Sequence, residues 1–151
     1  MEVVIDNLED LKKYIKVKKD KKEIFIKFED VVFNCALPNK ETFHYFQEGS
    51  VQDYTITIKA RNITFMHSAE CDNIYANNVT SKETIICKLL NVIGDTYGAY
   101  IETDVFIGYN VEVNSFITKK ICCNKIKSAY LSIDNEDYFY LKASSINNIG
   151  V

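Results

Sequence analysis

Two histidines and five cysteines are the residues of this sequence best suited to metal binding or nucleophilic catalysis. They are His44, His67, Cys35, Cys71, Cys87, Cys122 and Cys123. His67 and Cys71 have a ligand-like spacing, but a structural zinc site needs a second close pair of ligands, which the chain does not offer. Cys122 and Cys123 are adjacent, so on a strand their side chains point to opposite faces. The sequence therefore predicts no metal site and no cofactor.

Motifs of known catalytic and phosphate-binding sites are also missing. The sequence has only five glycines, and none belongs to a G-x-S-x-G, Walker or Rossmann motif. Enzymes that cleave carbohydrates on long β-helices use clustered carboxylates, whereas Glu102 and Asp104 are the one close acidic pair in the middle of this chain. We therefore expect a protein that is not an enzyme.

The distribution of charge favours binding instead. Eight lysines precede residue 28, whereas residues 89–118 contain no lysine or arginine and carry four acidic residues interleaved with tyrosines. These acids and tyrosines are Asp95, Tyr97, Tyr100, Glu102, Asp104, Tyr109 and Glu112. Tyrosine rings supply contact area at low entropic cost, and carboxylates attract a cationic partner. We expect this set to bind a basic protein; the alternative is a solvated acidic face whose tyrosines pack against their neighbours.

The elements that position these residues are expected to form a single domain over residues 1–151. Asn7 is a candidate N-cap for a short amphipathic helix over residues 8–16, and the sequence VKKDKK that follows is typical of an exposed turn. Residues 1–22 are thus predicted to be a helical cap with a lysine-rich turn. Residues 23–151 are predicted to be a β-rich body, with a loop around Pro38 and a short helical turn over residues 41–47.

A short pattern recurs through the β-rich body: an aliphatic residue, a small residue two places later, and an apolar residue three places after that. Its clearest occurrences start at Ile58, Ile74, Ile85, Ile121 and Leu141. Several steps between successive starts are at or within one residue of a multiple of five. A solenoid explains this spacing, because small residues face inward where two walls come close and larger aliphatic residues fill the interior.

We expect such a solenoid to take roughly 20 residues per coil and to make about six coils over residues 25–150, with rungs about 4.8 Å apart. The helix would cap one end. Asn77, Asn78, Asn147 and Asn148 are expected at corners, because asparagine tolerates left-handed backbone angles. The alternative fold is an antiparallel β-sandwich or barrel, since strand alternation fits either.

Over residues 55–150 the chain resembles pentapeptide-repeat proteins, which are right-handed β-helices with a small residue two positions before a central aliphatic one. Asn77 and Asn124 occupy the position after the small residue, where that family usually has Asp or Asn. Some members are similar in shape to a DNA duplex and occupy the channel of a nucleic-acid-binding enzyme. The resemblance thus implies an inhibitor of a basic, nucleic-acid-handling protein. The composition, rich in lysine, isoleucine and asparagine, suits an AT-rich genome, which permits a phage or mobile element as the source.

Two other functions are considered: a self-assembling structural solenoid, such as a homodimer, and a small carbohydrate-active or carbohydrate-binding module. The net charge of -3 and the pI near 5.4 predict no direct contact with nucleic acid. The first thirty residues contain no apolar run of signal-peptide length, and no long apolar segment follows. We therefore expect a cytoplasmic protein that does not interact with membranes.

Overall fold

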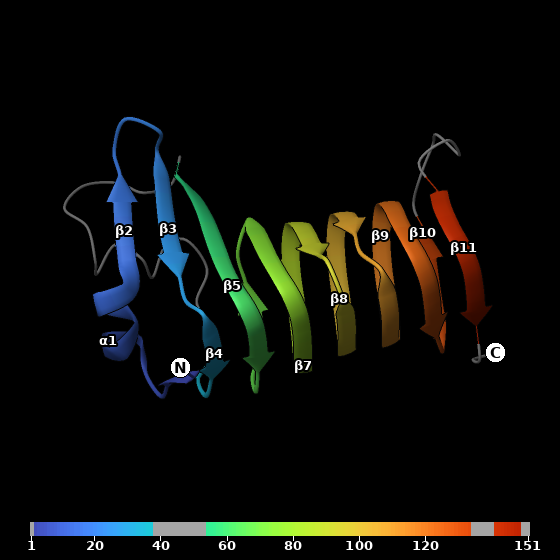
Figure 1. Ribbon diagram of the computed structural model, residues 1–151, viewed down its shortest axis with the longest axis horizontal. Helices are drawn as coiled ribbons and strands as arrows, with labels where there is room; N and C mark the ends of the chain where they lie inside the picture. The colour runs from blue at the N-terminus through green and yellow to red at the C-terminus, as the bar shows by residue number, and fades with distance from the viewer. Residues whose placement is uncertain (1, 38–53, 134–140, 149–151) are drawn as a thin grey trace.

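Residues 2–37, 54–133 and 141–148 are described by the computed structural model, and most of them lie in β-strands that coil around one long axis. Figure 1 shows this axis horizontal, with the N-terminus near one end and the C-terminus near the other. The fold is a parallel β-solenoid of about five turns with one short helix near the N-terminus. The predicted solenoid is confirmed, and the antiparallel sandwich or barrel is wrong.

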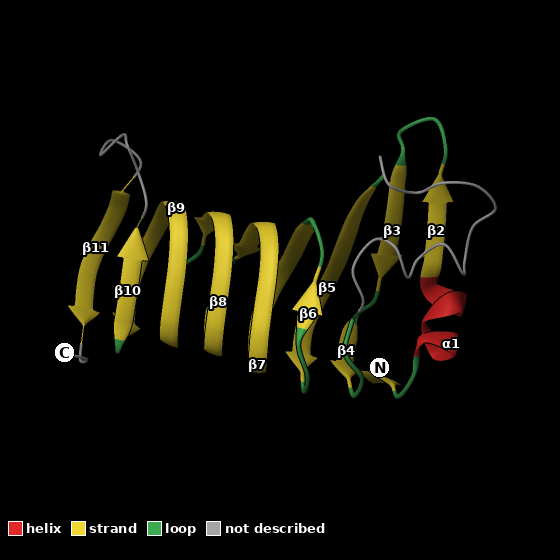
Figure 2. Ribbon diagram, turned by 180° about the vertical axis from the view of Figure 1, so that it is seen from behind, coloured by secondary structure: helices red, strands yellow, loops and turns green. Residues whose placement is uncertain are grey.

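Within the described ranges, eleven strands make up the sheet. They are β1 (Glu2–Ile5), β2 (Ile15–Lys18), β3 (Glu23–Lys27), β4 (Asp30–Phe33), β5 (Thr55–Phe65), β6 (Ala69–Glu70), β7 (Asn73–Val92), β8 (Asp95–Ile107), β9 (Asn110–Ser128), β10 (Tyr130–Ile133) and β11 (Leu141–Asn148). Neighbouring strands pair in parallel except β2 and β3, which are antiparallel. The longest strands, β7, β8 and β9, bend and pass around the rod, as the views from front and back show (Figures 1 and 2).

The strand registers divide each coil into three sides, and each side stacks on the same side of the next coil. In the coil that begins with β5, the first side is residues 57–60, the second is residues 62–65, and the third is residues 69–71. The third side of β7, residues 84–87, pairs with residues 100–103 of β8. The equivalent segments of every other coil are likewise its first, second and third sides.

The length of a coil differs from the expected value of about 20 residues. Asn62 lies beside Asn78 in the next coil, a step of 16 residues, and Asp95 lies beside Asn110, a step of 15 residues. Among the described strands, only the step from β9 into β11, in which Ile121 pairs with Leu141, has the expected length. Three sides of the length seen here make a coil of 15 or 16 residues. A coil of about 20 residues would need four such sides. About five turns result, rather than six.

The core confirms the inward role of the small residues. On most sides two buried residues are separated by one outward residue, as in Ile58 and Ala60, or Ile85 and Cys87. Ala60 lies directly beside Ala76 of the next coil, so these small inward residues stack on one another along the same side of the solenoid. Larger side chains fill the remaining interior, where burying one aliphatic side chain contributes about 1.5–3 kcal/mol.

The N-terminal cap is only partly helical. Asn7 is the N-cap, as predicted, because its side-chain oxygen accepts a hydrogen bond of 3.1 Å from the Asp10 N–H. However, helix α1 spans only Leu8–Leu11, a 3-10 helix follows over Lys12–Tyr14, and Ile15 already begins β2. The expected helix over residues 8–16 is therefore too long, since β-branched Ile15 and Val17 pair with β3 instead. The helical turn expected at residues 41–47 lies outside the described residues.

The asparagines do not make left-handed corners. Asn77 and Asn78 lie within β7, Asn147 and Asn148 lie within β11, and Lys22 is the one non-glycine residue with a positive φ in the described part of the chain. The outward amide of Asn78 instead donates a 2.8 Å hydrogen bond to Asn62 Oδ1 in the preceding coil. Asparagine is used here for stacking between coils and not for turning.

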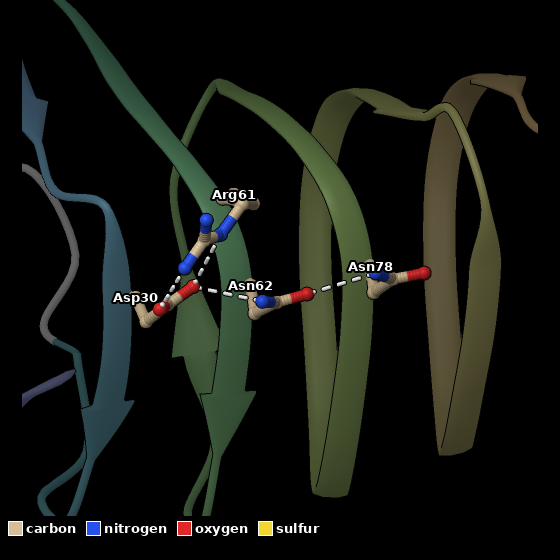
Figure 3. Close-up of polar contacts among 4 residues, drawn as sticks. All are labelled: Asp30, Arg61, Asn62 and Asn78. Atoms are coloured by element: carbon tan, nitrogen blue, oxygen red, sulfur yellow. Dashed lines mark hydrogen bonds and ion pairs between the residues drawn. The ribbon is translucent and has the colours of Figure 1, made fainter. Parts of the chain in front are cut away.

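This stacking continues along the second side as a ladder of polar side chains. Asn62 donates to Asp30 Oδ1 at 2.8 Å, and Arg61 clamps the same carboxylate through two hydrogen bonds of 3.1 and 2.6 Å (Figure 3). In the other direction, Asn78 Oδ1 accepts from the Asp95 N–H at 3.0 Å, and Asn110 donates to Asp95 Oδ1 at 3.4 Å. The ladder holds successive coils in register.

Candidate functional site

The seven residues predicted to form an acidic, tyrosine-bearing face come from β8, β9 and the corners beside them, but they occupy more than one side of the solenoid. Asp95, Tyr97 and Glu112 lie on the second side, and Tyr109 lies at the corner that leads into it. Tyr100 and Glu102 lie on the third side, and Asp104 lies at the corner between the third and first sides. The structure therefore brings four of the seven together.

Asp95, Tyr97 and Glu112 surround a shallow hollow, and Tyr109 at the corner directly precedes Asn110, which also lines it. We call Asp95, Tyr97, Tyr109 and Glu112 the second-side cluster. Tyr97 lies opposite Glu112 in the β8–β9 register, and Asp95 lies opposite Asn110. A hollow of about 310 Å³ is lined by Asp95, Tyr97, Asn110, Val111, Glu112, Lys125 and Lys127. Tyr97 is 48% exposed and Tyr109 is 52% exposed, so both rings are available to a partner.

Sequence reasoning missed the lysines that approach these acids. Lys127 Nζ lies 3.9 Å from Glu112 Oε1, and Lys119 Nζ lies 3.6 Å from Asp104 Oδ1. The partners of both pairs are one coil apart, which is 15 residues in this region. The lysine-free segment 89–118 is therefore not free of positive charge in space. A search for opposite charges at the spacing of one coil would have found both pairs.

Asp104 belongs to a separate arrangement at its corner, where charges alternate from coil to coil. The successive corner residues are Asp72, Lys88, Asp104 and Lys119. The Asp72 carboxylate is buried, accepts a 2.8 Å hydrogen bond from the Ile56 N–H, and lies 3.5 Å from Lys88 Nζ. This pattern gives Asp104 a role in holding coils together that is independent of any partner.

The third-side pair differs in character from the second-side cluster. Glu102 lies between Ile86 and Ile117 in the registers of the flanking coils, and Tyr100 lies between Thr84 and Ser115. Both side chains are half-buried, in contrast to the exposed rings of Tyr97 and Tyr109. Tyr100 and Glu102 therefore do not extend the second-side cluster.

The histidine and cysteine pair singled out by its spacing does not form a ligand set. His67 Nδ1 lies 3.5 Å from Glu83 Oε1 in an exposed pair, whereas Cys71 is buried in the core. Burial raises the pKa of Cys71 well above its usual value and raises the pKa of Cys87 to about 12. These thiols stay protonated near neutral pH and serve as small core side chains. His44 lies outside the described residues.

Neither a metal centre nor a membrane span is visible in the described ranges. No group of three or more histidine, cysteine or acidic side chains is close enough to hold a metal ion there. In the same ranges, no helix has the length and apolar character needed to cross a bilayer. Comparison with models of known protein families, with curated proteins and with solved structures gave no match for this chain. Its function is therefore argued from the surface of the solenoid.

Proposed function

We propose that the chain is a non-enzymatic binding protein that holds a basic partner protein on its second side, through Asp95, Tyr97, Tyr109 and Glu112. The observation that carries this proposal is the hollow itself, which is lined by the half-exposed ring of Tyr97 and by the carboxylates of Asp95 and Glu112, with the half-exposed ring of Tyr109 at the adjoining corner. Exposed aromatic rings next to charged groups are characteristic of protein interfaces, where aromatic residues act as anchors. The parallel strands hold the cluster in place before binding, which lowers the entropic cost of association.

The lysines at this site are not expected to block a basic partner, because a partner's cation can replace Lys127 beside Glu112. The Lys127–Glu112 pair is wide, at 3.9 Å, and both side chains are largely exposed. Exposed pairs of this kind contribute only about 0–1 kcal/mol. An arginine from a partner would form a two-pronged pair with the Glu112 carboxylate, which is stronger than the bond to Lys127. Binding is thus expected to weaken as salt is added.

A narrower form of the proposal concerns the kind of partner. The alternation of two inward residues in every five supports kinship with pentapeptide-repeat solenoids. On that kinship we propose that the partner is a nucleic-acid-handling protein of the cytoplasm, that binding inhibits it, and that the chain comes from a phage or mobile element. The composition, rich in lysine, isoleucine and asparagine, suits an AT-rich genome, which is compatible with that origin.

The test places a photo-crosslinking amino acid at Tyr97 and identifies crosslinked proteins from nuclease-treated host lysate by mass spectrometry. Glu112→Lys reverses one charge of the second-side cluster, and Glu102→Lys makes the same change on the third side, so the second variant is the control. We expect Glu112→Lys to abolish the crosslink and Glu102→Lys to retain it, with both variants folded by circular dichroism. Equal loss in both variants, or no crosslinked basic protein, would refute the proposal.

A further inference from the structure

A second charged surface of opposite sign lies on the N-terminal hairpin, which consists of β2, the turn at residues 19–22, and β3. Residues 12–27 contain eight lysines and two acidic residues, a formal charge of +6 in a chain whose net charge is -3. The hairpin lies at the N-terminal end of the rod, away from β8 and β9 (Figure 1). The charge of the whole chain therefore conceals a strongly basic region.

The six lysines of this hairpin, together with Lys12 and Lys13 that precede it, have few partners within the described part of the chain. Of the eight, only Lys18 lies within ion-pair distance of a described carboxylate, 3.5 Å from Glu23. Lys27 is in register with Lys59 of β5, and both are exposed, so two like charges lie side by side on adjacent strands. Like charges in this position are destabilising. A bound anion would offset that repulsion.

The tip of the hairpin provides an independent sign of function. Lys22 has a φ of 49°, in the left-handed region that favours glycine or asparagine. Its carbonyl oxygen accepts a 2.9 Å hydrogen bond from the Thr55 N–H, so the fold fixes this conformation. A lysine therefore occupies a position where glycine would be less strained, and strain of this kind concentrates at functional sites.

We propose that this surface, centred on Lys16, Lys22, Lys27 and Lys59, binds the phosphate backbone of nucleic acid without sequence specificity. Lysines two residues apart on a strand are separated by about 6.6 Å, and neighbouring strands by about 4.8 Å, so the cations form a grid that an extended polyanion can follow. Lysine binds phosphate as a point charge and supplies no planar fork for reading bases. This contact is independent of the partner proposed for the second-side cluster. It replaces the expectation, drawn from the net charge of -3, that the chain makes no direct contact with nucleic acid.

An anionic membrane is less well matched to this surface. Membrane-surface segments combine basic residues with apolar side chains that enter the lipid. The large exposed apolar residues among the described ranges are Val4, Met66, Tyr75, Ile86, Ile93, Tyr97, Ile107, Tyr109 and Tyr130. None lies in residues 12–27. The ring of Phe25 is only partly exposed and carries Lys18 Nζ at 4.4 Å from its centre.

The experiment measures binding of the full chain to a fluorescent DNA duplex of random sequence by anisotropy over a range of salt concentrations. The test variant replaces Lys16, Lys27 and Lys59 by glutamine. The control variant replaces Lys119, Lys125 and Lys127 by glutamine, which changes the net charge equally. We expect the test variant to lower the slope of log affinity against log salt by up to about 2.7 and the control to leave it unchanged.

The substitution Lys22→Gly separates the role of Lys22 in DNA binding from its role in folding. We expect it to weaken DNA binding without lowering the melting temperature, because glycine relieves the left-handed strain. The proposal is overturned if the wild-type chain does not bind duplex at low salt, or if both triple variants lose affinity equally. Binding to phosphatidylserine vesicles without binding to DNA would also overturn it, in favour of a membrane surface.

Discussion

Replacing Thr96 by valine should stabilise the fold. Thr96 is fully buried on the second side, and its hydroxyl has no hydrogen-bond partner among the described residues. In the flanking coils the registered residues are Val79 and Val111, so the position accepts a valine. Burying an unpaired hydroxyl costs about 1–3 kcal/mol. We expect Thr96→Val to raise the free energy of unfolding by about 1–2 kcal/mol, and the melting temperature by roughly 2–8 °C.

The same substitution at Thr118 provides a matched control. Thr118 is 1% exposed, but its hydroxyl donates a 2.9 Å hydrogen bond to the Lys120 carbonyl oxygen. Because that bond is lost, Thr118→Val should lower the free energy of unfolding by about 1 kcal/mol. Urea denaturation followed by circular dichroism measures both variants. Effects of the same sign would show that hydrogen-bond pairing of the hydroxyl does not decide stability in this core.

Two further substitutions test the contacts between coils. Gly94→Ala should lower the melting temperature measured by circular dichroism, because the added Cβ would lie 2.8 Å from the Asn77 backbone oxygen and 2.6 Å from the Asn78 side-chain oxygen. A melting temperature equal to that of the wild type would mean that the backbone moves apart there without cost. Hydrogen bonds from Arg61, and then from Asn62, lower the pKa of Asp30 from 3.8 to about 2. Because the folded pKa is the lower one, the stabilisation is present above pH 3.8 and is lost as pH falls toward 2. Arg61→Ala should move this pKa back toward 3.8 in an NMR titration, and an unmoved pKa would exclude Arg61 as its main cause.

The sequence by itself determined the character of the core. The order of Ile58, Ala60 and Ile63 predicted which side chains face inward, and all three are buried. This inference succeeds because the direction of each side chain along a strand depends on local backbone geometry. The position of Thr96 between Val79 and Val111 did not follow from the sequence, because the steps to these residues are 17 and 15 residues and only the strand registers align them.

Only the tertiary structure decided how many sides a coil has. That number depends on where the chain bends and closes on itself, which is a non-local property that a five-residue pattern leaves open. Whether a coil has three sides or four determines which charges become neighbours. Three sides place Lys127 beside Glu112 and divide the predicted acidic face between two sides and two corners. Similarly, Asn78 stacks on Asn62 only because 16 residues complete the coil between them, so its place in the ladder follows from the closed coil and not from its own backbone preference.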